Sequence, residues 1–205
     1  MESYITIKKE GFFEYEDRKS VFIGQAKPVT TEAEAVEFIA SVKKQYPDAK
    51  HHVYAYVLRQ NQAMRFSDDH EPQGTAGMPV LDAIRKRGCT DVVIVVTRYF
   101  GGTLLGTGGL VHAYSTSAVG ALNSAEVVTF DIYSEILLEC SYSDYQKILP
   151  AISEHGFREE GTDYGECVKI SGTILKEKSE KFVDALIQIT SARVNVSVLS
   201  DKYGI

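Results

Sequence analysis

The chain has 205 residues, enough for one or two compact domains with their own hydrophobic cores. Hydrophobic residues make up 44% and charged residues 24%, so the composition is that of a globular protein and excludes a disordered chain. The net charge of −6 argues against unspecific nucleic-acid binding over the whole surface, so any nucleic-acid site has to be local.

The cysteines and the amino terminus bear on the cellular location. Cys89, Cys140 and Cys167 are odd in number and lie far apart without a C-x-x-C pair, which argues against a disulfide framework and a zinc site. The amino terminus lacks the apolar core of a signal peptide, and no apolar run approaches the roughly 20 residues of a membrane span. We expect a cytoplasmic protein without membrane contact, and the oligomeric state stays open.

The chain begins with a predicted hairpin and a helix. Residues 11–28 alternate loosely around a turn-like segment at 16–20, as in two antiparallel strands. Thr31 and Glu34 form a capping-box pattern, which predicts a helix that ends before Pro47.

The next elements alternate between strands and helices. Residues 53–58 and 63–66 predict a second hairpin, and the apolar stripe of residues 78–87 predicts a helix. The continuous apolar run at 92–96 indicates a central strand covered by helices on both faces. A helix with many small residues is predicted at 108–122.

The pattern becomes regular after residue 130. The predicted elements are a strand at 133–140, a helix at 144–155, strands at 157–164 and 167–174, a helix at 179–189 and a strand at 194–199. This β-α-β-β-α-β order is typical of ferredoxin-like domains. We therefore expect an α+β protein with two domains, residues 1–130 and 131–205. The second is the more acidic, with 13 acidic and 8 basic residues against 15 and 14 in the first.

Five glycines crowd the segment between the predicted strand at 92–96 and the helix that follows; they are Gly101, Gly102, Gly106, Gly108 and Gly109. A Walker loop is excluded because Thr107 stands where its lysine is required, and a dinucleotide loop is excluded because Val111 stands where a glycine is required. Two interpretations stay open. The segment forms an anion site with Arg98 at a helix amino terminus, or it only forms a tight corner.

A second polar segment, residues 67–77, places three carboxylates within four positions. Asp68, Asp69 and Glu71 could hold magnesium or include a general base. They could equally be turn and capping residues for the next helix. His51 and His52 open a predicted strand and so point to opposite faces, which leaves His52 as a further catalytic candidate.

Four blocks of sequence together resemble the IMPACT/YigZ family, in its bacterial YigZ-like branch. They begin at Lys19 (KSVFI), Asp48 (DAKHHVYAY), Phe66 (FSDDHEPQGTAG) and Arg98 (RYFGGTLLGTGGL), and the resemblance covers about residues 15–125. The family usually has a glycine where His70 stands here, a position that would favour glycine if its φ is positive. The family's cysteine after the paired histidines is Val53 in this chain.

The resemblance implies a fold for each domain. The amino-terminal domain would be similar to the second domain of small-subunit ribosomal protein five, with a left-handed βαβ arrangement. The carboxy-terminal domain would be similar to the last domain of elongation factor G. Ligand-binding candidates on the matching blocks are Lys19, Ser67, Thr75, Arg98, Tyr99, Gly101, Gly102, Gly106, Thr107, Gly108 and Gly109.

Two functions remain open. One is a non-catalytic, translation-associated protein that binds RNA, the ribosome or a translation-related protein, as both fold similarities imply. The other is an enzyme acting on a phosphorylated small molecule or nucleotide. In that case Arg98 and the glycines would hold the phosphate, and the acidic residues would hold magnesium or act as a base. Of these two, the sequence favours binding.

Overall fold

The computed structural model describes residues 2–205 and has an α+β fold with two compact units, as predicted from the sequence. One unit is Tyr4–Thr129, and the other is Phe130–Ile205 together with Glu2 and Ser3. The division falls inside one strand, between Thr129 and Phe130. None of the helices in residues 2–205 combines the length and the apolar character needed to span a bilayer.

The first unit contains five strands that form its sheet and three helices that cover it, besides the strand β1 and a short 3₁₀ turn. In chain order they are β1 Tyr4–Ile7, β2 Gly11–Asp17, β3 Ser20–Pro28, α1 Glu32–Gln45, β4 His51–Val57, η1 Gln60–Gln62, β5 Met64–Ser67, α2 Gly77–Lys86, β6 Val92–Tyr99 and α3 Gly106–Ser124. Strands β2 to β6 form one sheet in the order β2-β3-β6-β4-β5, and all neighbours are antiparallel.

Local sequence explains how these elements begin and end. The predicted turn between β2 and β3 is confirmed; Arg18 and Lys19 both have positive φ, as a tight two-residue hairpin turn requires. The predicted capping box is also confirmed, because the Thr31 hydroxyl accepts from the Glu34 amide and the Glu34 carboxylate accepts from the Thr31 amide. Helix α1 then ends at Gln45, just before Pro47.

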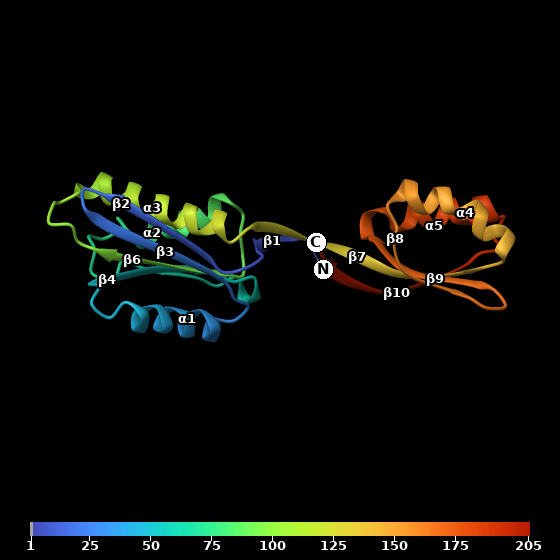
Figure 1. Cartoon of the computed structure of the whole chain (residues 1–205), viewed down its shortest axis with the longest axis horizontal. Coiled ribbons are helices and arrows are strands. Elements are labelled where there is room, and N and C mark those ends of the chain that lie inside the picture. Colours follow the sequence, from blue (N-terminus) through green and yellow to red (C-terminus); the bar gives the residue numbers. More distant parts are fainter. Residues whose placement is uncertain (1) are drawn as a thin grey trace. The chain divides into compact units, whose positions relative to one another are not determined.

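The central strand is β6, as its apolar run predicted. Alternate residues point to opposite faces, and both faces are buried. Val92, Ile94 and Val96 join the core formed with α2 and α3, while Val93 and Val95 join the core formed with α1. Figure 1 shows the result: α1 lies on one face of the sheet, and α2 and α3 lie on the other.

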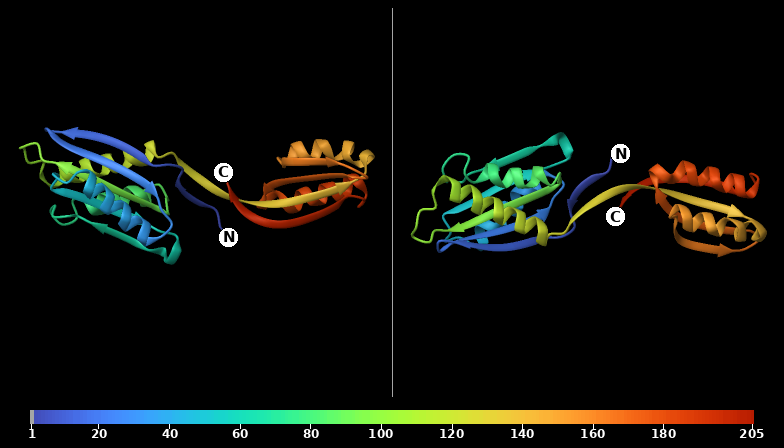
Figure 2. Two further views of the ribbon diagram at one scale, coloured as in Figure 1. Left: turned by 60° about the horizontal axis from the view of Figure 1, so that its bottom comes forward. Right: turned by 90° about the horizontal axis from the view of Figure 1, so that it is seen from above.

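The second unit has the predicted β-α-β-β-α-β order. Its elements are β7 Val127–Cys140, α4 Tyr142–His155, β8 Arg158–Tyr164, β9 Val168–Leu175, α5 Lys176–Thr190 and β10 Asn195–Gly204. The strands pair antiparallel in the order β10-β7-β9-β8. Helices α4 and α5 lie side by side on one face of this sheet (Figures 1 and 2). Strands β7 and β10 are longer than predicted, because residues 131–135 of β7 pair with residues 200–204 of β10.

Candidate functional site

The sheet of the first unit brings the two polar segments to one edge. Strands β5 and β6 both run antiparallel to β4, so their carboxyl ends lie at the same edge. Arg98 stands at the end of β6, and residues 67–77, here called the acidic segment, begin where β5 ends. Residues 101–109, here called the glycine corner, lead from the same edge into α3.

The acidic segment and the strand before the glycine corner meet in a buried ion pair. Arg98 Nη1 lies 2.6 Å from Glu71 Oε1, and the two side chains are only 6% and 4% exposed. The Tyr114 hydroxyl on α3 donates to the same carboxylate oxygen at 2.7 Å. Burial, followed by the negative charge of Glu71, raises the pKa of Tyr114, so its hydroxyl remains a hydrogen-bond donor.

The guanidinium of Arg98 also contacts aromatic rings. It lies 5.4 Å from the ring centre of Phe22 and 5.6 Å from that of Phe100, distances at which a cation is attracted to a ring face. In the sheet, Arg98 is paired with Phe22 on one side and with His51 on the other. These three side chains therefore belong to the same face of the sheet, the face that α2 and α3 cover.

Asp68 organises the acidic segment itself. Its carboxylate accepts hydrogen bonds from the amides of Gly74, Ala76 and Gly77, at 2.9, 3.1 and 2.8 Å. These amides lead into α2. The N-cap residue of this helix is Ala76, whose side chain cannot cap the helix amides. Asp68 therefore has the turn and capping role that the sequence left as one of its two alternatives.

Asp69 ties the acidic segment to β4. Its carboxylate accepts from the His52 amide at 2.6 Å and lies 3.6 Å from Lys43 Nζ. Its own amide donates to the Ser67 hydroxyl, and its carbonyl oxygen is 2.9 Å from His51 Nδ1. The carboxylate is thus already bonded within the fold.

The two histidines point to opposite faces, as the strand pattern predicted. His52 is buried beside Thr97, with its Nδ1 3.1 Å from the Thr97 hydroxyl, and burial lowers its pKa. His51 lies on the other face, next to Arg98. The candidate that the sequence chose was His52, but it is His51 that faces the cleft described below.

The glycine corner does form a tight turn. A Cβ atom on Gly101 would lie 2.0 Å from the carbonyl carbon of Lys19, so only glycine fits against that backbone. Gly102 and Gly106 have φ of +84° and +72°. Gly109 packs close to Leu105, whereas a Cβ on Gly108 would meet nothing within 4 Å. The corner interpretation therefore explains some of the five glycines but not Gly108.

A cleft of about 450 Å³ opens between the acidic segment and the glycine corner. It is lined by Lys50, His51, His70, Glu71, Pro72, Arg98, Phe100, Leu104, Leu105, Gly106, Thr107 and Leu110. Helix α3 begins at the cleft without a side-chain cap, so its first amides are not bonded by a capping side chain. Glu71 is the only carboxylate in this lining, and Arg98 and Tyr114 already hold it.

Several predicted ligand-binding residues do not line this cleft. Tyr99 donates to Asp48 at 2.8 Å, and the Thr75 hydroxyl donates to the Pro72 carbonyl oxygen at 2.7 Å. Ser67 accepts from the Asp69 amide, and Lys19 supports the corner through its backbone. These residues hold the loops in place.

Sequence reasoning missed Lys50, His51, Phe100, Leu104 and Tyr114. Phe100 and Leu104 line the cleft and are 52% and 81% exposed, which no local sequence pattern indicated. Lys50 directly precedes β4, and His51 begins it. The sheet register that pairs His51 with Arg98 cannot be read from local sequence.

No group of three or more His, Cys, Asp or Glu side chains in residues 2–205 is arranged to hold a metal ion. Of the three carboxylates proposed for magnesium, Asp68 and Asp69 accept from backbone amides, and Glu71 is held by Arg98 and Tyr114. The residues present therefore do not fit the magnesium site that the spacing of the acidic segment allowed.

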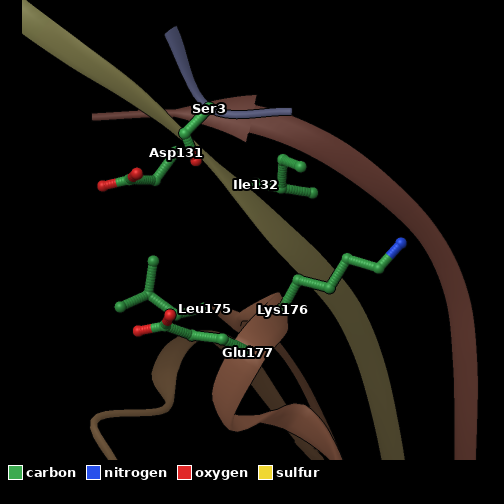
Figure 3. A pocket seen from close by; sticks show the side chains of 6 residues that line it. All are labelled: Ser3, Asp131, Ile132, Leu175, Lys176 and Glu177. Carbon is green, nitrogen blue, oxygen red and sulfur yellow. The ribbon is translucent and has the colours of Figure 1, made fainter. Parts of the chain in front are cut away.

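The second unit has a separate pocket of about 300 Å³ (Figure 3). It is lined by Ser3, Asp131, Ile132, Leu175, Lys176 and Glu177. The ammonium group of Lys176 points away from the carboxylates of Asp131 and Glu177 and is bonded to Asp201. None of the residues that the sequence singled out lies in this pocket.

Comparison with known proteins shows which family the chain resembles. Residues 18–122 match the model of the Impact N-terminal domain, and residues 138–193 match a domain of unknown function, DUF1949. The chain is 36% identical to the IMPACT family member YvyE of Bacillus subtilis over 197 residues, which cover 96% of this chain and 91% of YvyE. It is 31% identical to the IMPACT family member YigZ of Escherichia coli, over 91% of this chain and 93% of YigZ.

More distant sequence and structural similarities agree. Protein IMPACT of Bos taurus is 31% identical over 100 residues, which cover 47% of this chain and 31% of the bovine protein. The crystal structure of a hypothetical protein matches with a TM-score of 0.61 at 30% identity, over 98% of both chains. The match at the Impact N-terminal domain contains the whole cleft. The chain therefore belongs to the IMPACT family, with a YigZ-like arrangement of two domains.

Proposed function

We propose that this protein is a non-catalytic, translation-associated binding protein, and that the cleft of its first unit binds RNA. The observation that carries the proposal is the lining of the cleft. Lys50, His51, His70 and the uncapped start of α3 line it, while its one carboxylate is neutralised by Arg98. The ammonium group of Lys50 and the partial positive charge of the helix start, with no uncompensated carboxylate beside them, favour a phosphate-bearing ligand.

The rim of the cleft also suits RNA. Phe100 is half exposed beside Arg98, and an exposed ring offers a surface on which an unpaired base can stack. The acidic excess of the chain lies mainly after residue 130, so repulsion of RNA is weaker around the cleft than its total charge suggests. The resemblance of both domains to proteins of the ribosome and of translation supplies the cellular setting.

The candidate catalytic groups support binding over catalysis. The carboxylates of Asp68 and Asp69 accept backbone hydrogen bonds, and Glu71 is held by Arg98 and Tyr114. His52 is buried behind the sheet edge, with its ring beside Thr97. Each carboxylate thus already accepts a hydrogen bond from the fold, and the buried His52 ring is turned toward Thr97, which supports a structural role for these four groups.

The experiment is a titration of labelled single-stranded RNA at several salt concentrations, followed by fluorescence anisotropy. Lys50→Gln should weaken binding and make the slope of log K against log salt shallower by about 0.7, the value for one lost phosphate contact on a single strand. Lys86→Gln removes an exposed lysine from the far end of α2 and is the matched control. It should change neither quantity.

Two results would contradict the proposal. One is RNA binding that is the same in wild type and Lys50→Gln at every salt concentration, because the cleft would then not be the binding site. The other is turnover of a phosphorylated small molecule that is lost in Asp69→Asn, because that would revive the enzymatic alternative.

A further inference from the structure

One donor group at the floor of the cleft has no partner within the fold. Arg98 has five N–H groups, and its Nη1 bonds to Glu71. Its Nε is buried and has no hydrogen-bond partner among the described residues. A buried, charged donor without a partner is costly, and Arg98 is one of the residues that line the cleft, so its guanidinium keeps donor capacity for a ligand there.

A second set of donors faces the same cavity. Helix α3 begins at Gly106 without a side-chain cap, and Gly106 and Thr107 line the cleft. The amides of a first helical turn have no partners within the helix, and the helix dipole adds partial positive charge there. No side chain covers this turn at Gly108, since a Cβ there would meet nothing within 4 Å.

The depth of Arg98 limits which phosphate can reach both sets of donors. Its side chain is 6% exposed, so a ligand has to enter the cleft to contact it. A phosphate inside an RNA strand carries a nucleoside on both sides and stays near the surface. A terminal phosphate is esterified on one side only, projects beyond its nucleoside, and carries close to two negative charges at neutral pH.

We propose that the cleft binds the terminal phosphate of an RNA strand, a phosphate monoester, with the end nucleoside against Phe100. Arg98 and the first amides of α3 hold the phosphate oxygens, and Lys50 adds positive charge at the wall. Glu71 orients the guanidinium and is itself neutralised by it. This inference rests on the proposed function and adds the chemical group that is recognised.

The test compares one short RNA in three forms: with a 5′-phosphate, with a 3′-phosphate, and with hydroxyls at both ends. A nucleoside monophosphate is the competitor. We expect at least one phosphorylated form to bind about tenfold more tightly than the hydroxyl form, the effect of about one charge-assisted hydrogen bond. The form that gains affinity identifies the recognised end, and the monophosphate should compete with it.

Variants of Thr107 and Arg98 test whether the two sets of donors cause the tighter binding of phosphorylated RNA. Thr107→Glu places a carboxylate in the first turn of α3, which favours the helix but repels the phosphate. It should abolish the advantage of the phosphorylated RNA, while Thr107→Gln, the neutral control, should keep most of it. Arg98→Lys keeps a positive charge beside Glu71 but lacks Nε, and should also reduce the advantage. If Arg98→Lys does not fold, the Thr107 pair still decides.

The outcomes separate the two proposals. Equal affinity for all three RNAs would overturn the terminal-phosphate inference while RNA binding itself stands. If the nucleoside monophosphate binds but none of the RNAs does, the proposed function is overturned, and recognition of a phosphate monoester is supported. A phosphorylation advantage that is equally large in Thr107→Glu would overturn the assignment to this cleft.

Discussion

Arg98 and Glu71 are 27 positions apart in the sequence, yet their side chains form a buried ion pair of 2.6 Å. The pair joins the end of β6 to the acidic segment and so forms the floor of the cleft. Removing one partner of a buried pair leaves the other charge without compensation. We therefore expect Glu71→Gln to lower the free energy of unfolding by about 3 kcal/mol.

Chemical denaturation of Glu71→Gln measures this loss. Glu37→Gln is the matched control, because Glu37 is an exposed residue of α1. That control should change the free energy of unfolding by less than about 0.5 kcal/mol. A Glu71→Gln protein as stable as the control variant would show that the pair does not hold the two segments together.

Tyr114 is the third member of the buried network. Its hydroxyl donates to Glu71 at 2.7 Å from the middle of α3. Tyr114→Phe removes a hydrogen bond to a charged group and should cost about 2 kcal/mol. In a double-mutant cycle with Glu71→Gln, the two losses should not be additive, because both changes remove the same contact. Additive losses would argue that the hydroxyl acts independently of the carboxylate.

Two glycines of the glycine corner should respond differently to alanine. Gly101→Ala places a Cβ against the backbone of Lys19, at 2.0 Å in the present geometry, and should destabilise the protein by several kcal/mol or prevent folding. Gly108→Ala adds a methyl group in open space within α3 and should raise the free energy of unfolding by up to about 1 kcal/mol. Thermal unfolding of both variants checks this, and a stable Gly101→Ala protein would refute the tight corner.

His70 occupies a left-handed backbone position, with φ of +71°. This conformation costs a non-glycine residue about 1 kcal/mol, whereas glycine adopts it without that cost. His70→Gly should therefore raise the melting temperature slightly, although it removes a side chain that lines the cleft. Gly74→Ala, at φ +77° in the same segment, should lower it. A lower melting temperature for His70→Gly would mean that the imidazole contributes more than the strained backbone costs.

Asp144 should make the second unit sensitive to acid. Hydrogen bonds from Arg193, then from Lys147, hold the pKa of Asp144 well below its ordinary value. The stability that this group contributes is therefore complete above the unfolded-state pKa near 4, and is lost as the pH falls below it toward the folded-state pKa. We expect Asp144→Asn to lower the melting temperature at pH 7.

The pH dependence of the melting temperature of Asp144→Asn tests this explanation. The difference in melting temperature between wild type and Asp144→Asn should shrink as the pH falls below about 4. Glu154→Gln, an exposed change in the same helix, should leave the wild-type profile intact. A difference that stays constant from pH 7 to the lowest accessible pH would contradict the role of the Asp144 charge.

Elements with strong local signals were predictable from the sequence. The capping box at Thr31 begins α1, the paired positive-φ residues after Asp17 turn the first hairpin, and the apolar run of β6 marks the centre of the sheet. Each depends on residues within a few positions of one another. The regular pattern after residue 130 likewise predicted the β-α-β-β-α-β order.

The chemistry of the cleft was less predictable because it depends on long-range pairing. Asp68 could be a metal ligand or a cap until its three backbone donors were known. The choice between His51 and His52 depends on which of them is paired with Arg98 in the sheet. Tyr114, 43 positions from Glu71, carries no local signal that links it to the site.

RNA binding at the cleft can be mapped by ¹H–¹⁵N NMR spectra during a titration with single-stranded RNA. We expect the amide signals of Gly106 and Thr107, and of Gly108 in the same helical turn, to shift together with those of His51 and His70. The same RNA added to Thr107→Glu should leave these signals in place. Shifts confined to residues after Phe130, with the cleft signals unchanged, would contradict RNA binding at the cleft.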